Sequence, residues 1–468
     1  MTSLCQRLSS RLLIGGIALY IVAMPFYSSL SGSAHNDARL AQIPLFLLGT
    51  VVLFIGQKNL PNWTSFQQLT TTILVILAGI SCSLAKNHGA ALRECTLWIS
   101  LATLSAAVFI ACFQNKTIKF IMQAITLAWL VYSAFFFLAW VANLLAHGET
   151  HFWLAVPGFD NPRFLNHAQT IAIPLLAAAT IHTDKCRTEL ALSWIALCLC
   201  FAMLMALVAR ASTVSLILGT AAAVVVFGRA AFPLARRILL GGAIGFLIYL
   251  LIFQGIPHWF DLKTISSPHT PADLVSDHSR IYLWKIALYD VAKAPLIGVG
   301  PMHYSADFNG RGAHPHNIYL QLIAEFGVPF FVLLTTATVV LARRSLRHIR
   351  QTSHAPDTLT VATTAALVAA LVDGTFSGNF VVPMAQIWIC LAAGLFFAST
   401  NHPISTPGTT RGINLLAVVA LLGILSLQLL FSVETIQEYI HKPITIDNRP
   451  ALPGAEANSP RFWLDGWL

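Results

Sequence analysis

Long apolar runs separated by short polar segments fill the chain from its first residues to about residue 433. Most of these runs approach the ~20 helical residues that cross about 30 Å of hydrocarbon. They are continuously apolar and do not alternate with period two, which favours helices over a barrel. The pattern predicts an all-α integral membrane protein, a polytopic bundle of about 12–13 transmembrane helices. The runs lie near 12–29, 40–56, 69–85, 91–113, 119–146, 167–182, 189–209, 212–228, 238–254, 318–341, 359–373, 380–398 and 413–433.

The composition is also typical of a protein that lies largely within a lipid bilayer. Hydrophobic residues make up 56% and charged residues 10% of the sequence, against roughly 25% charged in a soluble domain. The first run follows Arg7 and Arg11 and has the look of a signal peptide. No small-residue cleavage site follows it, so we expect it to remain as the first helix.

The distribution of basic residues predicts the orientation. With the N-terminus in the cytoplasm, the cytoplasmic segments hold fifteen of the 28 Lys and Arg residues. The short loops on the other side hold five, namely Arg39, Lys86, Arg93, Arg163 and Arg210. The positive-inside rule then places the N-terminus inside and, for an odd number of spans, the C-terminal tail outside. One miscounted helix would reverse the position of the tail.

The net charge of +9 follows from this topology and requires no nucleic acid. The sequence contains no signature of a nucleic-acid module. The eight cysteines lie in or near the spans or at their cytoplasmic ends, and the long outer loop has none. We therefore expect no structural disulfide and no metal site.

Two hydrophilic segments on the outer side interrupt the membrane pattern. One covers about 147–166, and the larger covers 255–317. They divide the chain into N-terminal transmembrane helices at 1–254, the outer loop, and C-terminal transmembrane helices at 318–433. A polar tail follows at 434–468, which we expect on the outer side together with the long loop.

An amphipathic helix is predicted inside the long outer loop. Ile281, Trp284, Leu288 and Val291 fall at helical spacing, so we expect this helix to lie on the membrane surface. A glycine-rich turn follows at 295–301. It is too short for a nucleotide-binding loop and lacks the Gly-Lys-Ser/Thr that such a loop needs.

Ionisable groups at membrane depth are costly and commonly functional. Arg210 lies at a tight outer hairpin, and Arg163 and Arg280 add fixed positive charge on the same side. Guanidinium groups bind phosphate in a bidentate manner and keep their charge, so several of them indicate an anionic ligand. His316, at the mouth of the following helix, could take a proton from an attacking hydroxyl.

Each candidate also has a purely structural interpretation. Arg210 could snorkel to the interface, and Arg280 could anchor its helix to headgroups. Asp373, at the outer end of its span, could cap a helix, and Glu325 could serve only helix packing. His314 is interpreted first as a loop histidine.

Three stretches in and after the outer loop resemble the signature of the O-antigen ligase and polymerase superfamily. They are Arg280–Trp284, Pro295–Gly300 and His316–Gly327. The resemblance is most specific over about 275–330 and extends loosely over most of the chain. It implies a multi-pass protein of the bacterial inner membrane whose active site faces the periplasm. Such enzymes move a glycan from an undecaprenyl-diphosphate carrier to an acceptor hydroxyl.

The resemblance also implies roles for individual residues. His316 would activate the acceptor, and Asp373 would be a second catalytic residue by its position alone. An already activated donor needs positioning, neutralisation of the leaving diphosphate and one deprotonation, so we expect an inverting transfer with no metal, nucleotide or other cofactor. Arg163, Arg210 and Arg280 would bind the diphosphate, with Asn317, Glu325, His314 and Trp284 in support.

The acceptor is open at the level of sequence. Phe159–Thr170, Asp373–Asn379 and Arg461–Trp467 look most like the oligosaccharyltransferases that glycosylate type IV pilin. A protein acceptor such as pilin therefore comes first, then ligation of O-antigen to lipid A-core, then polymerisation of glycan repeats. The chain lacks, near 373–383, the histidine-rich acidic segment of the general protein-glycosylating ligases.

A flippase for a lipid-linked sugar is the alternative from another class. It too would use arginines and many helices, but transporters need polar groups that both leaflets can reach. Here the candidates gather on one side of the membrane, which favours a stationary site. Glycan transfer lost in His316→Ala, with the donor still delivered, would indicate an enzyme.

Overall fold

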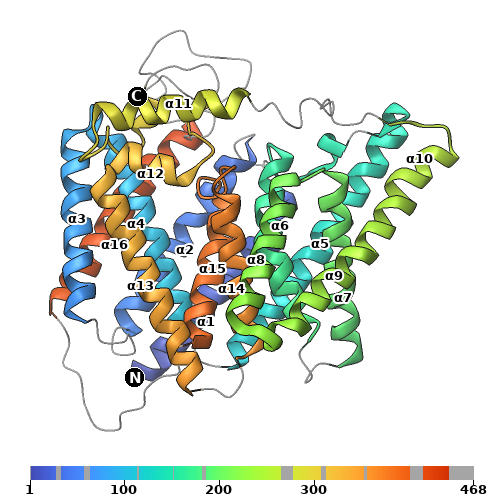
Figure 1. The fold of residues 1–468 in the computed structure, drawn as a ribbon, viewed down its shortest axis with the longest axis horizontal. Helices are drawn as coiled ribbons and strands as arrows, with labels where there is room; N and C mark the ends of the chain where they lie inside the picture. The colour runs from blue at the N-terminus through green and yellow to red at the C-terminus, as the bar shows by residue number, and fades with distance from the viewer. Residues whose placement is uncertain are drawn as a thin grey trace.

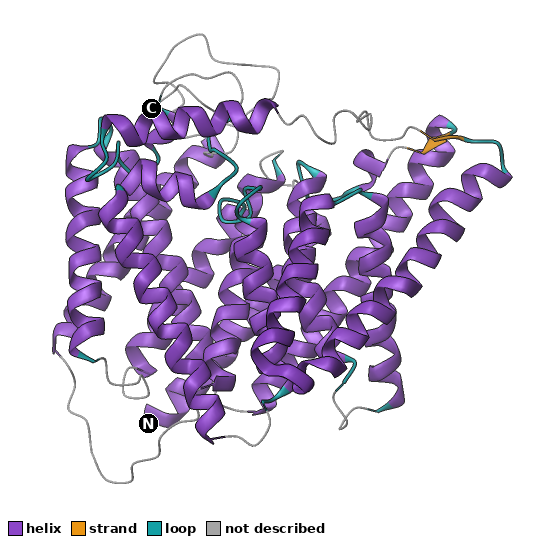
Figure 2. Ribbon diagram, viewed as in Figure 1, coloured by secondary structure: helices purple, strands orange, loops and turns teal. Residues whose placement is uncertain are grey.

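The protein is an all-α polytopic membrane protein in which almost every described residue is helical (Figures 1 and 2). The computed structural model describes residues 2–27, 33–56, 64–112, 115–150, 152–181, 186–264, 278–306, 312–352, 356–400 and 415–441. The helices are α1 Thr2–Val22, α2 Ala34–Gly56, α3 Ser65–Leu84, α4 His88–Ala111, α5 Asn115–His147, α6 Pro162–Ala179, α7 Arg187–Ala206, α8 Arg210–Phe227, α9 Phe232–Ile248, α10 Ile256–Trp259, α11 His278–Lys293, α12 Ile318–Phe326, α13 Val328–Thr352, α14 Thr358–Asp373, α15 Pro383–Thr400 and α16 Leu415–His441.

All thirteen predicted apolar runs fall on helices. In the described part of the chain, eight helical stretches are long and apolar enough to cross a membrane, and one of these, Arg210–Trp259, contains α8 and α9 in succession. Two shorter apolar helices, Thr358–Asp373 and Ala417–Val433, accompany them. Length and composition thus support the membrane bundle, and the predicted total of 12–13 spans stays a prediction.

The run predicted over 318–341 is two helices, which is a correction to the sequence analysis. α12 ends at Phe326, and α13 begins at Val328. Gly327 between them has φ +86°, and a Cβ built on it would lie 2.4 Å from the carbonyl oxygen of Leu296. Only glycine tolerates both conditions. The apolar pattern continues through the break and therefore did not indicate it.

The amphipathic helix predicted in the outer loop is α11, which lies across one end of the bundle (Figure 1). Its buried apolar residues are Leu283 and Ala287, which pack against Tyr304 and Ala324. Ile281 and Leu288, on the face expected to contact the membrane, are 49% and 54% exposed. The helix therefore covers α12 with one face and leaves its other apolar face outward.

The two outer segments meet in a short parallel pair of strands. β1 (Glu149–Thr150) belongs to the first segment, and β2 (Lys263–Thr264) belongs to the second. α16 continues the predicted last span as far as His441, so residues 434–441 of the predicted polar tail are helical. The rest of that tail, 442–468, lies outside the described residues.

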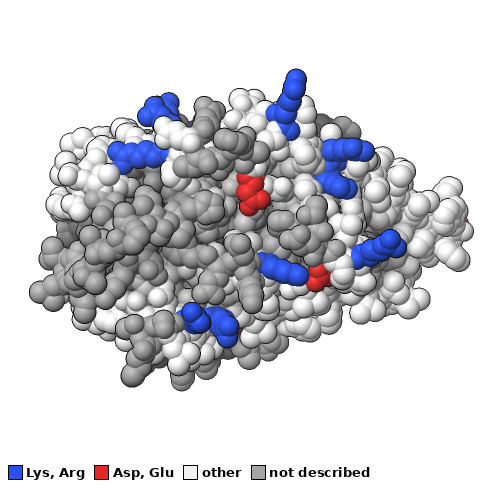
Figure 3. Space-filling view, turned by 90° about the horizontal axis from the view of Figure 1, so that it is seen from below, with Lys and Arg blue, Asp and Glu red and all other residues white. Residues whose placement is uncertain are grey.

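Lys and Arg side chains are scattered over the face of the molecule opposite α11 and outnumber Asp and Glu there (Figure 3). The ends of α1, α7 and α13 at this face carry Arg7, Arg187 and Arg347. Arg39, which we expected in a short loop on the other side, is instead inside α2 and 6% exposed. The distribution still fits a cytoplasmic N-terminus by the positive-inside rule.

Close helix contacts in the middle of the bundle position the site. Gly219 of α8 meets α14 so closely that an added Cβ would lie 2.4 Å from the carbonyl oxygen of Ala365. Small residues at such crossings allow backbones to approach in a membrane protein. α8 and α14 therefore pack closely together, and Arg210 begins α8 while Asp373 ends α14.

Candidate functional site

Three arginines predicted from the sequence lie within electrostatic range of one another at the end of the bundle that α11 covers (Figure 1). Arg163 lies in the first turn of α6, Arg210 is the first residue of α8, and Arg280 lies in the first turn of α11. Arg210 and Arg280 both act electrostatically on the Arg163 guanidinium. The pKa of Arg163 is lowered from the usual arginine value, mainly by burial and to a smaller extent by these two positive charges. The group stays charged because that value lies far above neutrality.

Backbone geometry between α7 and α8 sets the position of two of these arginines. Val208 has φ +49°, and its carbonyl oxygen accepts the backbone N–H of Arg210 at 2.9 Å. The same carbonyl accepts a hydrogen bond from Nη1 of Arg163 at 3.2 Å. Asn161 caps α6 by accepting the backbone N–H of Arg163 at 2.9 Å. One strained turn thus connects the starts of α6 and α8.

His316 lies on a segment that α11 holds in place. The indole Nε1 of Trp284 donates to the carbonyl oxygen of Pro315 at 3.1 Å. Trp284 follows Arg280 by four residues, so the two share a face of α11. His316 has φ +52° and donates its backbone N–H to Nδ1 of His314 at 3.1 Å, with the two rings 4.2 Å apart. His314 is buried, and the His316 side chain is half-buried.

The start of α12 docks on the outer end of α14. Asn317 caps α12 by accepting the backbone N–H groups of Tyr319 and Leu320, each at 3.0 Å. The backbone N–H of Ile318 donates to the carbonyl oxygen of Gly374 at 2.9 Å, one residue beyond Asp373. His316 and Asp373, 57 positions apart in the sequence, therefore lie on neighbouring segments.

Glu325 lies away from these groups, inside the packing of α12. It is 1% exposed, and its Oε1 accepts the backbone N–H of Tyr304 at 3.4 Å. Its carbonyl oxygen accepts the N–H of Gly300 at 3.1 Å and the Ser81 hydroxyl at 2.9 Å. These contacts connect α12 to the glycine-rich turn and to α3, so Glu325 supports the loop that carries the site.

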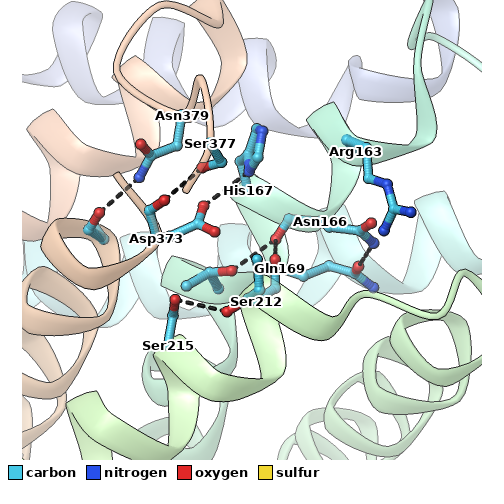
Figure 4. A network of polar contacts seen from close by, with 12 residues as sticks. Arg163, Asn166, His167, Gln169, Ser212, Ser215, Asp373, Ser377 and Asn379 are labelled. Carbon is cyan, nitrogen blue, oxygen red and sulfur yellow. Dashed lines mark hydrogen bonds and ion pairs between the residues drawn. The ribbon is translucent and has the colours of Figure 1, made fainter. Parts of the chain in front are cut away.

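Asp373 is fully buried and paired with a histidine that we did not single out from the sequence. Its Oδ2 lies 2.8 Å from Nδ1 of His167, and both side chains are at most 6% exposed (Figure 4). His167 follows Arg163 by one helical turn on α6. The other carboxylate oxygen, Oδ1, has no hydrogen-bond partner among the described residues. The predicted catalytic carboxylate of Asp373 is thus positioned by a contact from α6 as well as by its own helix, α14.

Figure 4 shows that this pair belongs to a buried polar layer between α6, α8 and α14. Ser212 of α8 donates to the carbonyl oxygen of Asn166 at 3.4 Å, and Ser377 donates to that of Asp373 at 2.8 Å. The sequence signal for His167 was the run Asn166, His167, Gln169 and Thr170 inside an otherwise apolar span. Polar side chains in such spans are commonly functional.

The arrangement can bind an anionic group and handle a proton. The arginine side chains arise from three different helices, so a bound diphosphate would meet positive charge from several directions. His316, with Arg280 and Trp284 beside its segment, is placed to accept a proton from a group held there. The buried His167–Asp373 pair fixes α6 against α14 beneath these groups.

One comparison with known proteins gives a match, which covers part of this region. Residues 195–335 match the family described as O-antigen ligase, a region that contains Arg210, Arg280 and His316. No curated protein matches the chain. Arg163, His167 and Asp373 lie outside the matched region. Residues 195–335 are therefore similar to the O-antigen ligase family, which supports the predicted resemblance to the O-antigen ligase and polymerase superfamily.

Proposed function

We propose that the protein is a periplasmic-face O-oligosaccharyltransferase. It moves an oligosaccharide en bloc from undecaprenyl diphosphate to a hydroxyl of a protein acceptor, with type IV pilin as the first candidate. The single observation that carries this proposal is the convergence of Arg163, Arg210 and Arg280, because three guanidinium groups fit the two phosphates of such a carrier.

In the proposed reaction the acceptor oxygen attacks the anomeric carbon of the donor glycan. A bond forms from that oxygen to the carbon, and the bond from the carbon to the phosphate oxygen breaks. Undecaprenyl diphosphate leaves with the electron pair, and its charge is neutralised by the arginines. The acceptor proton passes to His316. Direct displacement of this kind inverts the configuration at the anomeric carbon.

The remaining residues position these groups. Trp284 and His314 hold the segment of His316, and Asn317 caps the helix that follows it. Glu325 supports the same loop from α12. Asp373 acts together with His167, to which it is paired at 2.8 Å, and holds the outer end of α14 against α6. Because arginine charge neutralises the leaving diphosphate, we expect the reaction to proceed in EDTA.

Reconstitution of the purified protein tests the proposal. The protein would be supplied with an undecaprenyl-diphosphate oligosaccharide, and pilin and rough lipopolysaccharide would be offered together, in EDTA. We expect glycosylated pilin, and a loss of about 10²–10⁴-fold in rate for His316→Ala, the usual contribution of a general base. His258→Ala, at an exposed histidine of α10, is the matched control and should keep full activity.

Other products would redirect the assignment. Glycan on the lipid would make the protein an O-antigen ligase to lipid A-core, and longer carrier-linked glycan would make it a polymerase. No product in any of these assays, with donor stranded in the cytoplasmic leaflet of cells that lack the protein, would indicate a lipid-linked sugar flippase. Arg210→Ala and Arg280→Ala should each lower kcat/KM about 10- to 100-fold, the value of a lost charge-assisted hydrogen bond.

A further inference from the structure

Two cysteines outside the proposed site contact each other at the outer end of α3 and α4. Sγ of Cys82 and Sγ of Cys95 are 3.1 Å apart. Cys82 precedes the end of α3 by two residues, and Cys95 lies in the second turn of α4. Cys82 is half-buried, and Cys95 is 9% exposed. We propose that these two residues form a disulfide that joins α3 to α4.

The hairpin geometry favours closure of this bond. α3 ends at Leu84 and α4 begins at His88, so only residues 85–87 connect the two helices. Asn87 caps α4 by accepting the backbone N–H of Ala90 at 3.1 Å, which fixes the entry of the chain into that helix. A disulfide has sulfurs about 2.05 Å apart. The side chains therefore need to approach by about 1 Å, within a hairpin that already holds them in contact.

The contacts of this hairpin place the cysteines on the same side as the site. Ser81 donates its hydroxyl to the carbonyl oxygen of Glu325 at 2.9 Å. The backbone N–H of Asn87 donates to Nε2 of His303 at 2.8 Å. If the site faces the periplasm, as proposed above, the pair is in an oxidising compartment, where disulfides form and persist. This part of the argument rests on the proposed orientation.

The oxidation can be written as two exchange steps with an extracytoplasmic thiol–disulfide oxidoreductase in its disulfide form. Cys82, the more accessible sulfur, attacks one sulfur of the oxidant and forms a mixed disulfide while the other sulfur leaves as a thiolate. Cys95 then attacks the sulfur of Cys82 and displaces the second sulfur of the oxidant. The two electrons and the two thiol protons end on the oxidant, which leaves as a dithiol.

The bond would stabilise the support of the catalytic loop. The hairpin contacts the turn before α12 through His303 and α12 itself through Glu325. Gly300 of that turn lies so close to the hairpin that an added Cβ would be 2.6 Å from Cβ of Ala85. A cross-link between Cys82 and Cys95 lowers the conformational entropy of the unfolded hairpin. It therefore favours the folded state, in which the hairpin packs against α12 and the turn before it.

The test is to trap the thiols of the full-length protein in membranes by acid quenching and alkylation. Linked peptides are then identified by mass spectrometry without reduction. We expect most chains to carry the Cys82–Cys95 link. Cys5 and Cys186, both exposed and near the basic face opposite α11, are the matched controls and should be alkylated completely. Full alkylation of Cys82 and Cys95 in oxidant-competent cells would overturn the proposal.

A second labelling separates this failure from a failure of the proposed function. A membrane-impermeant maleimide should label Cys186 only after the cells are opened. If Cys82 and Cys95 are alkylated and Cys186 is labelled in intact cells, the orientation is reversed, and the periplasmic site falls with the disulfide. If Cys186 stays protected, the disulfide alone is refuted, and the site remains to be tested by reconstitution.

Stability provides an independent readout of the same bond. Dithiothreitol should lower the unfolding temperature of the purified wild-type protein, on the order of 5 °C for a short closed loop. The variant with Cys82→Ser and Cys95→Ser should already unfold at the lower temperature and show no response to the reductant. Cys198→Ser, a buried cysteine of α7, should retain the response. A wild-type protein that does not respond would count against the bond.

Discussion

Breaking the buried His167–Asp373 pair is the perturbation with the clearest structural magnitude. Asp373 is 0% exposed, and its 2.8 Å contact with His167 is its one side-chain ion pair among the described residues. His167→Ala leaves a buried carboxyl group without its hydrogen-bond partner, and removal of one partner of a buried pair costs about 3–5 kcal/mol. Asp373→Ala removes the same interaction from the other side. We expect each variant to lose about 3 kcal/mol of unfolding free energy.

The double variant distinguishes a true pair from two separate buried groups. After the first change no pair remains, so the second should add little, and the coupling energy should be about 2–3 kcal/mol. Asp373→Asn should cost only about 1 kcal/mol, because an amide can still exchange a hydrogen bond with the imidazole. Thr170→Val is the control, since Thr170 is fully buried on α6 but bonds only within its own helix, to the carbonyl oxygen of Asn166.

Unfolding of the purified protein in mixed micelles, as the fraction of a denaturing detergent is raised, measures these free energies. Helical circular dichroism reports the folded fraction. The reasoning is refuted if the single losses add in the double variant to within about 0.5 kcal/mol, which is the behaviour of independent sites. A loss for Thr170→Val as large as that for His167→Ala would refute it as well, because any buried polar group on α6 would then cost the same.

Three further predictions test other parts of the structure. Gly327→Ala should abolish transfer, because a Cβ at this left-handed position meets backbone, whereas Gly423→Ala, with open space around it, should be neutral in the same activity assay. Trp284→Phe loses the 3.1 Å hydrogen bond to Pro315 and part of the indole ring, and should lower kcat/KM by about fivefold with a stability loss of about 1 kcal/mol, measured by kinetics and melting in parallel. Arg39→Lys should destabilise the bundle by about 2 kcal/mol in the micelle assay, because an ammonium does not span the two glutamines and the carbonyl that the guanidinium bridges.

The membrane bundle was predictable from the sequence because lipid imposes a strong and local rule. Every backbone polar group must be satisfied inside the span, so long apolar runs become helices wherever they occur. The break at Gly327 was not predictable from apolarity, since apolar residues continue on both sides of it, and the helix-stop signal of Gly327 followed by Pro329 was passed over. Its cause is the approach of the Leu296 backbone, a contact between segments thirty-one positions apart.

The charged residues of the candidate site were predictable from the sequence, but the pairing of Asp373 with His167 was not. Arg163, Arg210 and Arg280 interrupt apolar or amphipathic stretches, and that local irregularity marks them. The partner of Asp373 is 206 positions away, and no local pattern carries such a distance. His167 belongs to a short polar run with Asn166, Gln169 and Thr170, and this run marks the position as unusual but does not name its partner. Arg39 was assigned to a loop because the start of α2 was placed too late.

Hydrogen bonds cross the limits of the region that matches the O-antigen ligase family, and this has a consequence for exchanging that region between proteins. Ser212 and Ile318 lie within residues 195–335, but they bond to Asn166 and Gly374, which lie on either side of that range. The matched region thus packs, at the proposed site, against segments that come before and after it in the chain. An exchange of 195–335 between two such enzymes would join half of each site, and the hybrid should transfer glycan only when α6 and α14 are exchanged with it.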